Sequence, residues 1–176
     1  MFNIKDRITK NRQHIVDTLC ELISIPTVNP PGQSYKTCVD YLSNKLKEWG
    51  FNHSIIEVPE KDYPRYSIVG EFGEGKKSIL FHGHYDVVPA ASVDQFMPNI
   101  HSKRLYGRGS SDMKSGLVAI LYLLRIIKEL NLDLGGKIYF SLVPDEETGG
   151  KKGTRYLLET GSLPLPSLGM IMPEAY

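Results

Sequence analysis

Short apolar segments alternate with amphipathic helical patterns along this chain, and that alternation limits the folds open to it. Apolar residues recur every three or four positions over 4–23, 34–49 and 111–130, which predicts helices there, with another over about 150–159. The predicted strands are rich in β-branched residues and bordered by Gly or Pro: 53–58, 66–72, 78–81, 137–143 and 168–172. This order predicts an α/β fold with a three-layer, largely parallel mixed sheet flanked by helices.

The charge and length of the chain argue against several classes of protein. Lys and Arg number 21 and Asp and Glu number 20, without the basic excess usual in proteins that bind nucleic acids or anionic membranes. The longest apolar run, 117–124, is far shorter than the roughly 20 residues that span a bilayer. The first residues lack the apolar core of a signal peptide, and two cysteines cannot form a disulfide framework. We therefore expect a soluble, cytoplasmic protein with no nucleic-acid or membrane partner.

A His-x-His-x-Asp sequence lies at the end of one predicted strand. Alternate side chains of an extended chain share a face, so His82, His84 and Asp86 are able to point the same way. A histidine that binds a metal ion is commonly oriented by a nearby carboxylate. Two structural histidines at a strand end would give the same pattern, and this segment alone does not separate the two interpretations.

Acidic residues also follow two other segments: one aspartate comes after a glycine-rich segment, and three consecutive acids come after a buried strand. Asp112 comes after 107–109 and before a predicted helix, where an isolated Asp is most often only the helix N-cap. The segment has neither dinucleotide-binding nor P-loop spacing, which argues against nucleotide binding. Asp145, Glu146 and Glu147 follow a strand, and adjacent carboxylates repel one another unless cations lie between them. Taken alone, a solvated acidic turn is the simpler interpretation of that run.

These segments become informative in combination. Four of their residues lie at strand exits or just after them: His84, Asp112, Glu147 and Glu174. Open α/β sheets bind ligands at the carboxyl ends of their strands, so we expect these side chains on one edge of the sheet. Imidazole and carboxylate ligands suit zinc, cobalt or manganese, and a carboxylate shared by two ions is typical of cocatalytic hydrolases. A further, unligated Glu would serve as a general base.

Four segments carry a resemblance to a known family: Ser24-Ile-Pro-Thr-Val-Asn-Pro-Pro-Gly32, Gly83-His-Tyr-Asp-Val-Val-Pro89, Tyr106-Gly-Arg-Gly-Ser-Ser-Asp-Met-Lys114 and Asp145-Glu-Glu-Thr-Gly149. In this order they make the chain similar to the M20 metallopeptidases, which include acetylornithine deacetylase, succinyl-diaminopimelate desuccinylase, aminoacylase and glutamate carboxypeptidase. The first segment favours the deacetylase and desuccinylase branch. The resemblance implies an incomplete zinc-exopeptidase-like catalytic domain that hydrolyses an amide bond in N-acyl amino acids or small peptides.

The resemblance also implies two zinc ions per full-length active site, with cobalt or manganese possible, and a set of ligands for the first ion. His84 would bind that ion and Asp86 would orient the imidazole. Asp112 would bridge both ions, and Glu174 would complete the first set. Because the family tends to hold the peptide after the bridging Asp in cis, we expect a cis Asp112–Met113 bond.

The remaining residues of the acidic turn receive two other roles from the resemblance. Glu146 would act as the general base and Glu147 as a ligand of the second ion, whose set is incomplete in this chain. His82 varies within the family, so we expect it to be structural.

Family members are typically much longer than this chain. We therefore expect residues 1–176 to form the N-terminal portion of the metallohydrolase catalytic domain, without the lid or dimerisation domain and the C-terminal part of the catalytic domain. The expected partner is a small N-acyl amino acid or peptide substrate, and the full-length parent is expected to be a homodimer. We expect little or no activity from such a chain alone. The alternative is a naturally short, non-catalytic remnant that folds and binds a metal ion or a partner.

Overall fold

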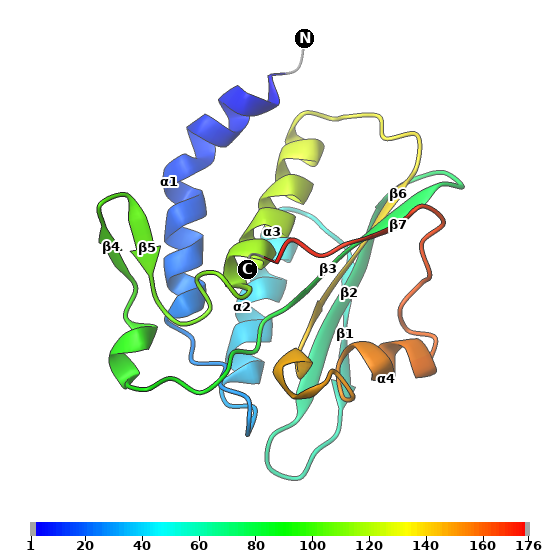
Figure 1. The fold of residues 1–176 in the computed structure, drawn as a ribbon. Coiled ribbons are helices and arrows are strands. Elements are labelled where there is room, and N and C mark those ends of the chain that lie inside the picture. The colour runs from blue at the N-terminus through cyan, green and yellow to red at the C-terminus, as the bar shows by residue number, and fades with distance from the viewer. Residues whose placement is uncertain (1–2, 175–176) are drawn as a thin grey trace.

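The computed structural model describes residues 3–174. A five-stranded sheet forms its centre (Figure 1), and the strands are β1 (His53–Val58), β2 (Arg65–Gly73), β3 (Ser78–His84), β6 (Lys137–Val143) and β7 (Gly169–Ile171). Their order across the sheet is β1-β2-β6-β3-β7. β3 pairs in parallel with β6 and β7, whereas the β1–β2 and β2–β6 pairs are antiparallel. The predicted mixed sheet is confirmed, and in its parallel part the carboxyl ends of three strands meet at one edge.

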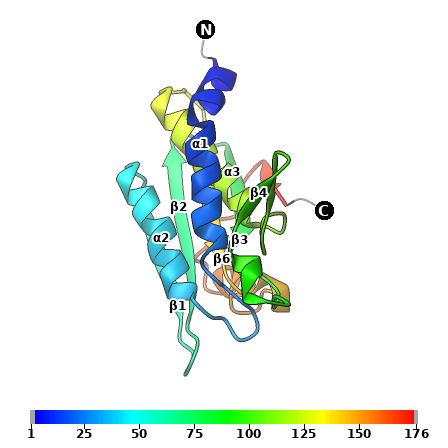
Figure 2. The ribbon, with the colours of Figure 1, turned by 90° about the vertical axis from the view of Figure 1, so that its left-hand side faces the viewer.

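Helices lie on both sides of this sheet, which gives the three predicted layers. The helices are α1 (Ile4–Ile23), α2 (Tyr35–Glu48), α3 (Lys114–Glu129) and α4 (Thr154–Glu159). Helices α2 and α3 pack on one face, α1 packs on α3, and α4 lies against the opposite face (Figures 1 and 2). No helix among residues 3–174 has an apolar stretch long enough to cross a bilayer.

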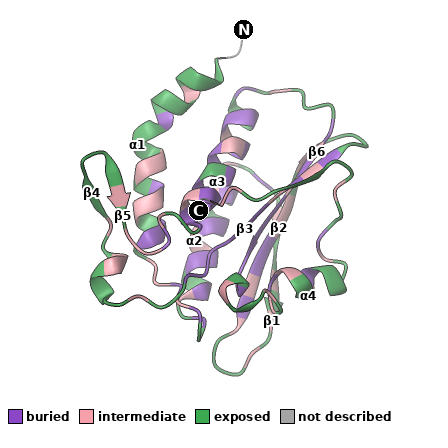
Figure 3. Ribbon diagram, in the orientation of Figure 1, coloured by how far each residue is buried: buried purple, intermediate pink, exposed green. Residues whose placement is uncertain are grey.

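Two apolar clusters hold the layers together. The larger cluster lies between the helices and the sheet and includes Leu42, Leu117 and Phe140, whose side chains are all inaccessible to solvent. The smaller one, which contains Leu80 and Leu157, lies under α4. Burial is therefore concentrated in the central strands and in α3, whereas much of α1 and α4 is exposed (Figure 3).

Several local features differ from the sequence-based expectation: α4 begins at Thr154 rather than at about 150, and β3 continues to His84 rather than ending at 81. A hairpin of β4 (Asn99–His101) and β5 (Arg104–Tyr106) was not predicted, because nearly all of its residues are exposed and give no apolar alternation. Helix α3 begins at Lys114, three residues later than predicted, after a loop that holds Asp112. The predicted cis peptide bond between Asp112 and Met113 is present.

A buried lysine joins the start of α3 to the end of α1. The side chain of Lys114 is fully buried, and its Nζ donates hydrogen bonds to the carbonyl oxygens of Leu22 (2.8 Å) and Ile25 (2.7 Å). The carboxyl end of a helix has unpaired carbonyl groups and a partial negative charge, which a cation stabilises. Burial lowers the pKa of Lys114 to about 8, against the opposing effects of Cys38 and Asp86. Lys114 thus fixes the loop before α3 against α1.

Replacing Lys114 with Met should lower the free energy of unfolding by about 1–3 kcal/mol, because two buried carbonyl oxygens lose a charged donor and keep only a backbone N–H each. Urea denaturation followed by circular dichroism measures this loss. Lys10→Met, at an exposed position of α1, is the matched control and should change stability by less than about 0.5 kcal/mol. Equal losses in the two variants would contradict the role assigned to the Lys114 hydrogen bonds.

Candidate metal centre

Three of the predicted metal ligands come together at the carboxyl edge of the parallel strands. His84 ends β3, Asp112 lies in the loop before α3, and Glu174 follows β7. One ligand atom from each residue lies within 4.8 Å of the other two, and His84 Nε2 is 3.1 Å from Asp112 Oδ1. His84 is buried, Asp112 is exposed and Glu174 is half-buried. One imidazole and two carboxylates, open to solvent on one side, form a donor set that fits zinc, cobalt or manganese.

A close contact between α3 and the segment after β7 brings Glu174 into place. A Cβ atom at Gly116 would overlap the carbonyl oxygen of Pro173, so only glycine allows this approach. The segment after β7 therefore lies against the first turn of α3, beside the loop that holds Asp112. This contact places Glu174 next to Asp112 although 62 positions separate them in the sequence.

Asp86 fixes the orientation of the His84 ring. His84 Nδ1 lies 3.1 Å from the backbone oxygen of Asp86 and 3.2 Å from its Oδ1, and both residues are fully buried. With Nδ1 donating to Asp86, Nε2 is the nitrogen that faces Asp112 and is left to bind a cation.

The charges around His84 favour a bound cation. Burial alone lowers the pKa of His84, but the hydrogen bond and charge of Asp86, together with the charges of Glu146 and Asp112, outweigh burial and raise that pKa to about 9. The pKa of Glu174 is raised by burial and by the charge of Asp112. Without a metal ion the imidazole therefore carries a second proton at neutral pH. This proton is on Nε2, the atom that would bind the metal ion.

The turn after β6, η2 (Glu146–Thr148), carries the other two predicted residues. Glu146 Oε2 lies 3.7 Å from His84 Nε2, at the border of the three-ligand group. Glu147 lies outside that group, and its Oε1 accepts a hydrogen bond from the backbone N–H of Val88 at 3.2 Å. Burial and then the charge of Asp112 raise the pKa of Glu147, so its carboxylate lies within electrostatic reach of the proposed bridging ligand.

The first acid of the turn has a structural role that the sequence did not reveal. Asp145 adopts a left-handed backbone conformation with φ of 73°. Its Oδ1 accepts a hydrogen bond from the Thr148 hydroxyl (2.9 Å), and its Oδ2 accepts one from the backbone N–H of Lys152 (2.9 Å). Asp145 therefore holds the turn that presents Glu146 and Glu147 against the start of the following segment.

His82 points into a separate buried network, in keeping with the structural role expected of it. Its Nδ1 is 2.7 Å from Ser141 Oγ and its Nε2 is 3.0 Å from Thr154 Oγ1. Burial and then the charge of His84 lower the pKa of His82 to about 4, so the ring is neutral at physiological pH. His82 links β3 to β6 and α4 and is not part of the three-ligand group.

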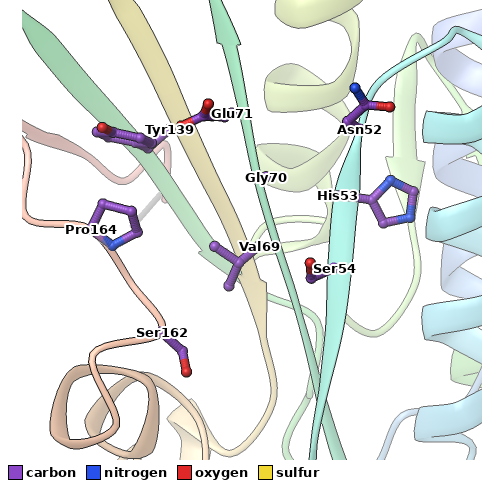
Figure 4. Close-up of a pocket in the computed structure, with 9 residues that line it drawn as sticks. All are labelled: Asn52, His53, Ser54, Val69, Gly70, Glu71, Tyr139, Ser162 and Pro164. Atoms are coloured by element: carbon purple, nitrogen blue, oxygen red, sulfur yellow. The ribbon is translucent and has the colours of Figure 1, made fainter.

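A separate recess lies on the sheet face away from α2 and α3 (Figure 4). It has a volume of about 310 Å³, and its walls include Val69 and Tyr139 from the sheet and Pro164 from the loop after α4. None of the predicted site residues lines it. Its carboxylate, Glu71, lies 3.2 Å from the ammonium group of Lys137. The recess is therefore distinct from the metal centre.

Comparison with known proteins agrees with this geometry. Residues 80–174, more than half of the chain, match Peptidase family M20/M25/M40. The chain belongs to this family. M20 metallopeptidases are metal-dependent hydrolases, and the three-ligand group is the candidate metal site of this member.

Individual relatives of this M20 chain are longer than it is. Succinyl-diaminopimelate desuccinylase of Orientia tsutsugamushi is 32% identical over 154 residues, which cover 85% of this chain and 39% of the relative. N-formyl-4-amino-5-aminomethyl-2-methylpyrimidine deformylase of Halalkalibacterium halodurans is 28% identical over 88% of this chain and 37% of its own length. Human carnosine dipeptidase 1 shares the fold, with a TM-score of 0.81, 21% identity, and coverage of 96% of this chain and 40% of that structure.

Zinc binding to the three-ligand group should release about one proton at pH 7.5. The pKa of His84 is about 9 without metal, and the ring must lose this proton to bind a cation. The zinc affinity should therefore rise with pH by about tenfold per unit up to pH 9. Calorimetry in two buffers with different ionisation enthalpies counts the protons released.

The control for this titration is His101→Ala, which removes an exposed histidine of β4 and should leave the proton count unchanged. A binding heat that is the same in both buffers would show that His84 is not protonated in the metal-free chain.

Proposed function

We propose that this chain is part of a dinuclear zinc-dependent hydrolase that cleaves the amide bond of N-acyl amino acids or small peptides. The observation that carries the proposal is the convergence of His84, Asp112 and Glu174, with the Glu146 carboxylate 3.7 Å from the imidazole. Relatives named as a desuccinylase, a deformylase and a dipeptidase support an amide as the bond broken. Acyl amino acids with N-succinyl or N-acetyl groups are the first substrates to test.

We assign residues 1–176 to the N-terminal portion of the catalytic domain. The chain spans only 39% of the desuccinylase relative, which supports this assignment. The parent enzyme would also contain a lid or dimerisation domain and the C-terminal part of the catalytic domain. We propose that this parent is a homodimer. The two cysteines of this chain, Cys20 and Cys38, are free thiols, which supports a reducing, cytoplasmic location.

The first metal ion has the more complete ligand set. His84, Asp112 and Glu174 supply three ligands, the number that catalytic zinc sites typically take from the protein. The second ion would share Asp112 and add only Glu147, whose Oε1 accepts a hydrogen bond from the Val88 N–H. We therefore expect one tightly bound ion per chain, and slow turnover by these residues alone.

A zinc ion held there would supply a Lewis acid that polarises the amide carbonyl and makes water acidic enough to deprotonate near neutral pH. Glu146 would accept that proton at Oε2 as the water oxygen attacks the carbonyl carbon. It would then return the proton to the amine nitrogen as the carbon–nitrogen bond breaks. The backbone N–H of Glu146 donates to Asp86 Oδ1 (3.2 Å), so the main chain is held while the half-exposed carboxylate is free to move.

Zinc stoichiometry tests the metal centre. The purified chain should bind one zinc ion tightly, as measured by chelator competition and elemental analysis. Asp112→Asn should lose this ion, because the neutral amide is a poorer ligand and removes one of two negative charges. Asp94→Asn, an exposed substitution with the same change of charge, should retain it. A chain without bound zinc, or equal zinc in both variants, would contradict the proposal.

Amide hydrolysis tests the role of Glu146. The zinc-loaded chain should release free amine slowly from an N-succinyl or N-acetyl amino acid, detected by chromatography. Glu146→Gln should lower that rate by about 100- to 10,000-fold, since the amide cannot accept a proton, while zinc affinity changes little. Glu48→Gln, at an exposed position of α2, is the control. Amine release that Glu146→Gln leaves unchanged would contradict the assignment of Glu146 as the base.

A further inference from the structure

The segment between α1 and α2 forms a short strap along the chain that follows β3. Val28 and Val87 form an isolated parallel bridge. The backbone N–H of Asn29 donates to the carbonyl oxygen of Val87 (2.9 Å), and the N–H of Val87 donates to that of Thr27 (3.0 Å). These reciprocal hydrogen bonds fix the main chain of residues 27–29 beside Asp86.

The strap brings one buried amide into the site. Asn29 is 1% exposed, and its Nδ2 lies 2.8 Å from Asp86 Oδ2 and 2.9 Å from Thr148 Oγ1. An amide NH₂ group has two hydrogens, so each of these oxygens receives one. The Thr148 hydroxyl in turn donates a hydrogen bond to Asp145 Oδ1 (2.9 Å).

The two groups that Asn29 contacts both hold residues of the site in place. Asp86 orients His84 and also accepts hydrogen bonds from the backbone N–H groups of Glu146 (3.2 Å) and Glu147 (3.1 Å). Thr148 is the last residue of the turn that carries both glutamates. Asn29 therefore spans the junction between the imidazole ligand and the acidic turn.

We propose that Asn29 is a positioning residue that sets the relative placement of His84 and the 146–148 turn, and so tunes metal affinity without touching the metal itself. This inference rests on the proposed zinc centre. A neutral amide suits the position because it donates to both oxygens and adds no charge beside the buried Asp86. A carboxylate would face Asp86 across 2.8 Å with no hydrogen to share, and an aliphatic side chain would leave both acceptors short of a donor.

The test is zinc affinity by chelator competition in Asn29→Leu, which keeps the side-chain size and removes both donors. The zinc dissociation constant should rise about 10- to 100-fold, as is usual when a hydrogen-bonding partner of a metal ligand is lost. Asn11→Leu is the matched control, since Asn11 is also buried and its amide also acts as a donor, with one hydrogen bond to the carbonyl oxygen of Arg7 (2.9 Å). The zinc affinity of Asn11→Leu should stay within threefold of the wild type, even if its thermal stability falls as much as that of Asn29→Leu.

Thr148→Val supplies a second variant, because it removes the second acceptor of the Asn29 amide, together with the hydrogen bond from the Thr148 hydroxyl to Asp145 Oδ1, and leaves Asp86 in place. Its zinc dissociation constant should rise by about tenfold. The double variant Asn29→Leu/Thr148→Val should weaken zinc binding by less than the product of the two single effects, because both changes break the same Asn29–Thr148 hydrogen bond. Fully multiplicative effects would place Asn29 and Thr148 in separate roles and overturn the proposal.

The wild-type measurement separates this inference from the proposed function. If the wild type binds zinc and Asn29→Leu binds it within threefold as tightly, the positioning role is wrong and the zinc centre stands. If Asn29→Leu does not fold, unchanged zinc affinity in Thr148→Val overturns the role in the same way. If the wild type binds no zinc, the proposed metal centre fails, and the role of Asn29 fails with it.

Discussion

The buried carboxylate of Asp86 is the group on which the arrangement of this site depends. It is inaccessible to solvent, and a charge in that position is costly unless donors surround it. Three elements supply those donors: the imidazole of His84 at the end of β3, the amide of Asn29 in the strap, and the backbone N–H groups of Glu146 and Glu147. The need to satisfy one carboxylate thus draws together residues that are more than 100 positions apart.

The parallel part of the sheet explains why the site is where it is. Strands β6, β3 and β7 run the same way, so the residues that follow them share one edge. Helix α3 returns to that edge with its first turn, anchored to α1 by Lys114. The antiparallel strands β1 and β2 widen the sheet but carry no ligand. The position of the metal centre is therefore a consequence of strand direction and of the tight α3 contact at Gly116.

The sequence was sufficient for those parts of the molecule that follow from local pattern. Helical and strand periodicity predicted the elements of the sheet and its cover, and strand exits identified His84 and Glu174 as neighbours. Contacts that depend on the assembled fold were beyond it. The hydrogen bonds of Asn29 join segments that nothing in the local pattern connects, and the structural role of Asp145 depends on a left-handed backbone hidden in an acidic run. The β4–β5 hairpin escaped prediction because its exposed residues lack an apolar face.

The most direct test of the account is the position of zinc in crystals of the metal-loaded chain, located by anomalous diffraction at the zinc edge. We expect the strongest peak about 2.0–2.2 Å from His84 Nε2 and from one carboxylate oxygen each of Asp112 and Glu174. His84 Nδ1 should still face Asp86. A peak at His82, or at exposed histidines with none at His84, would contradict the assignment of this edge of the sheet as the metal centre.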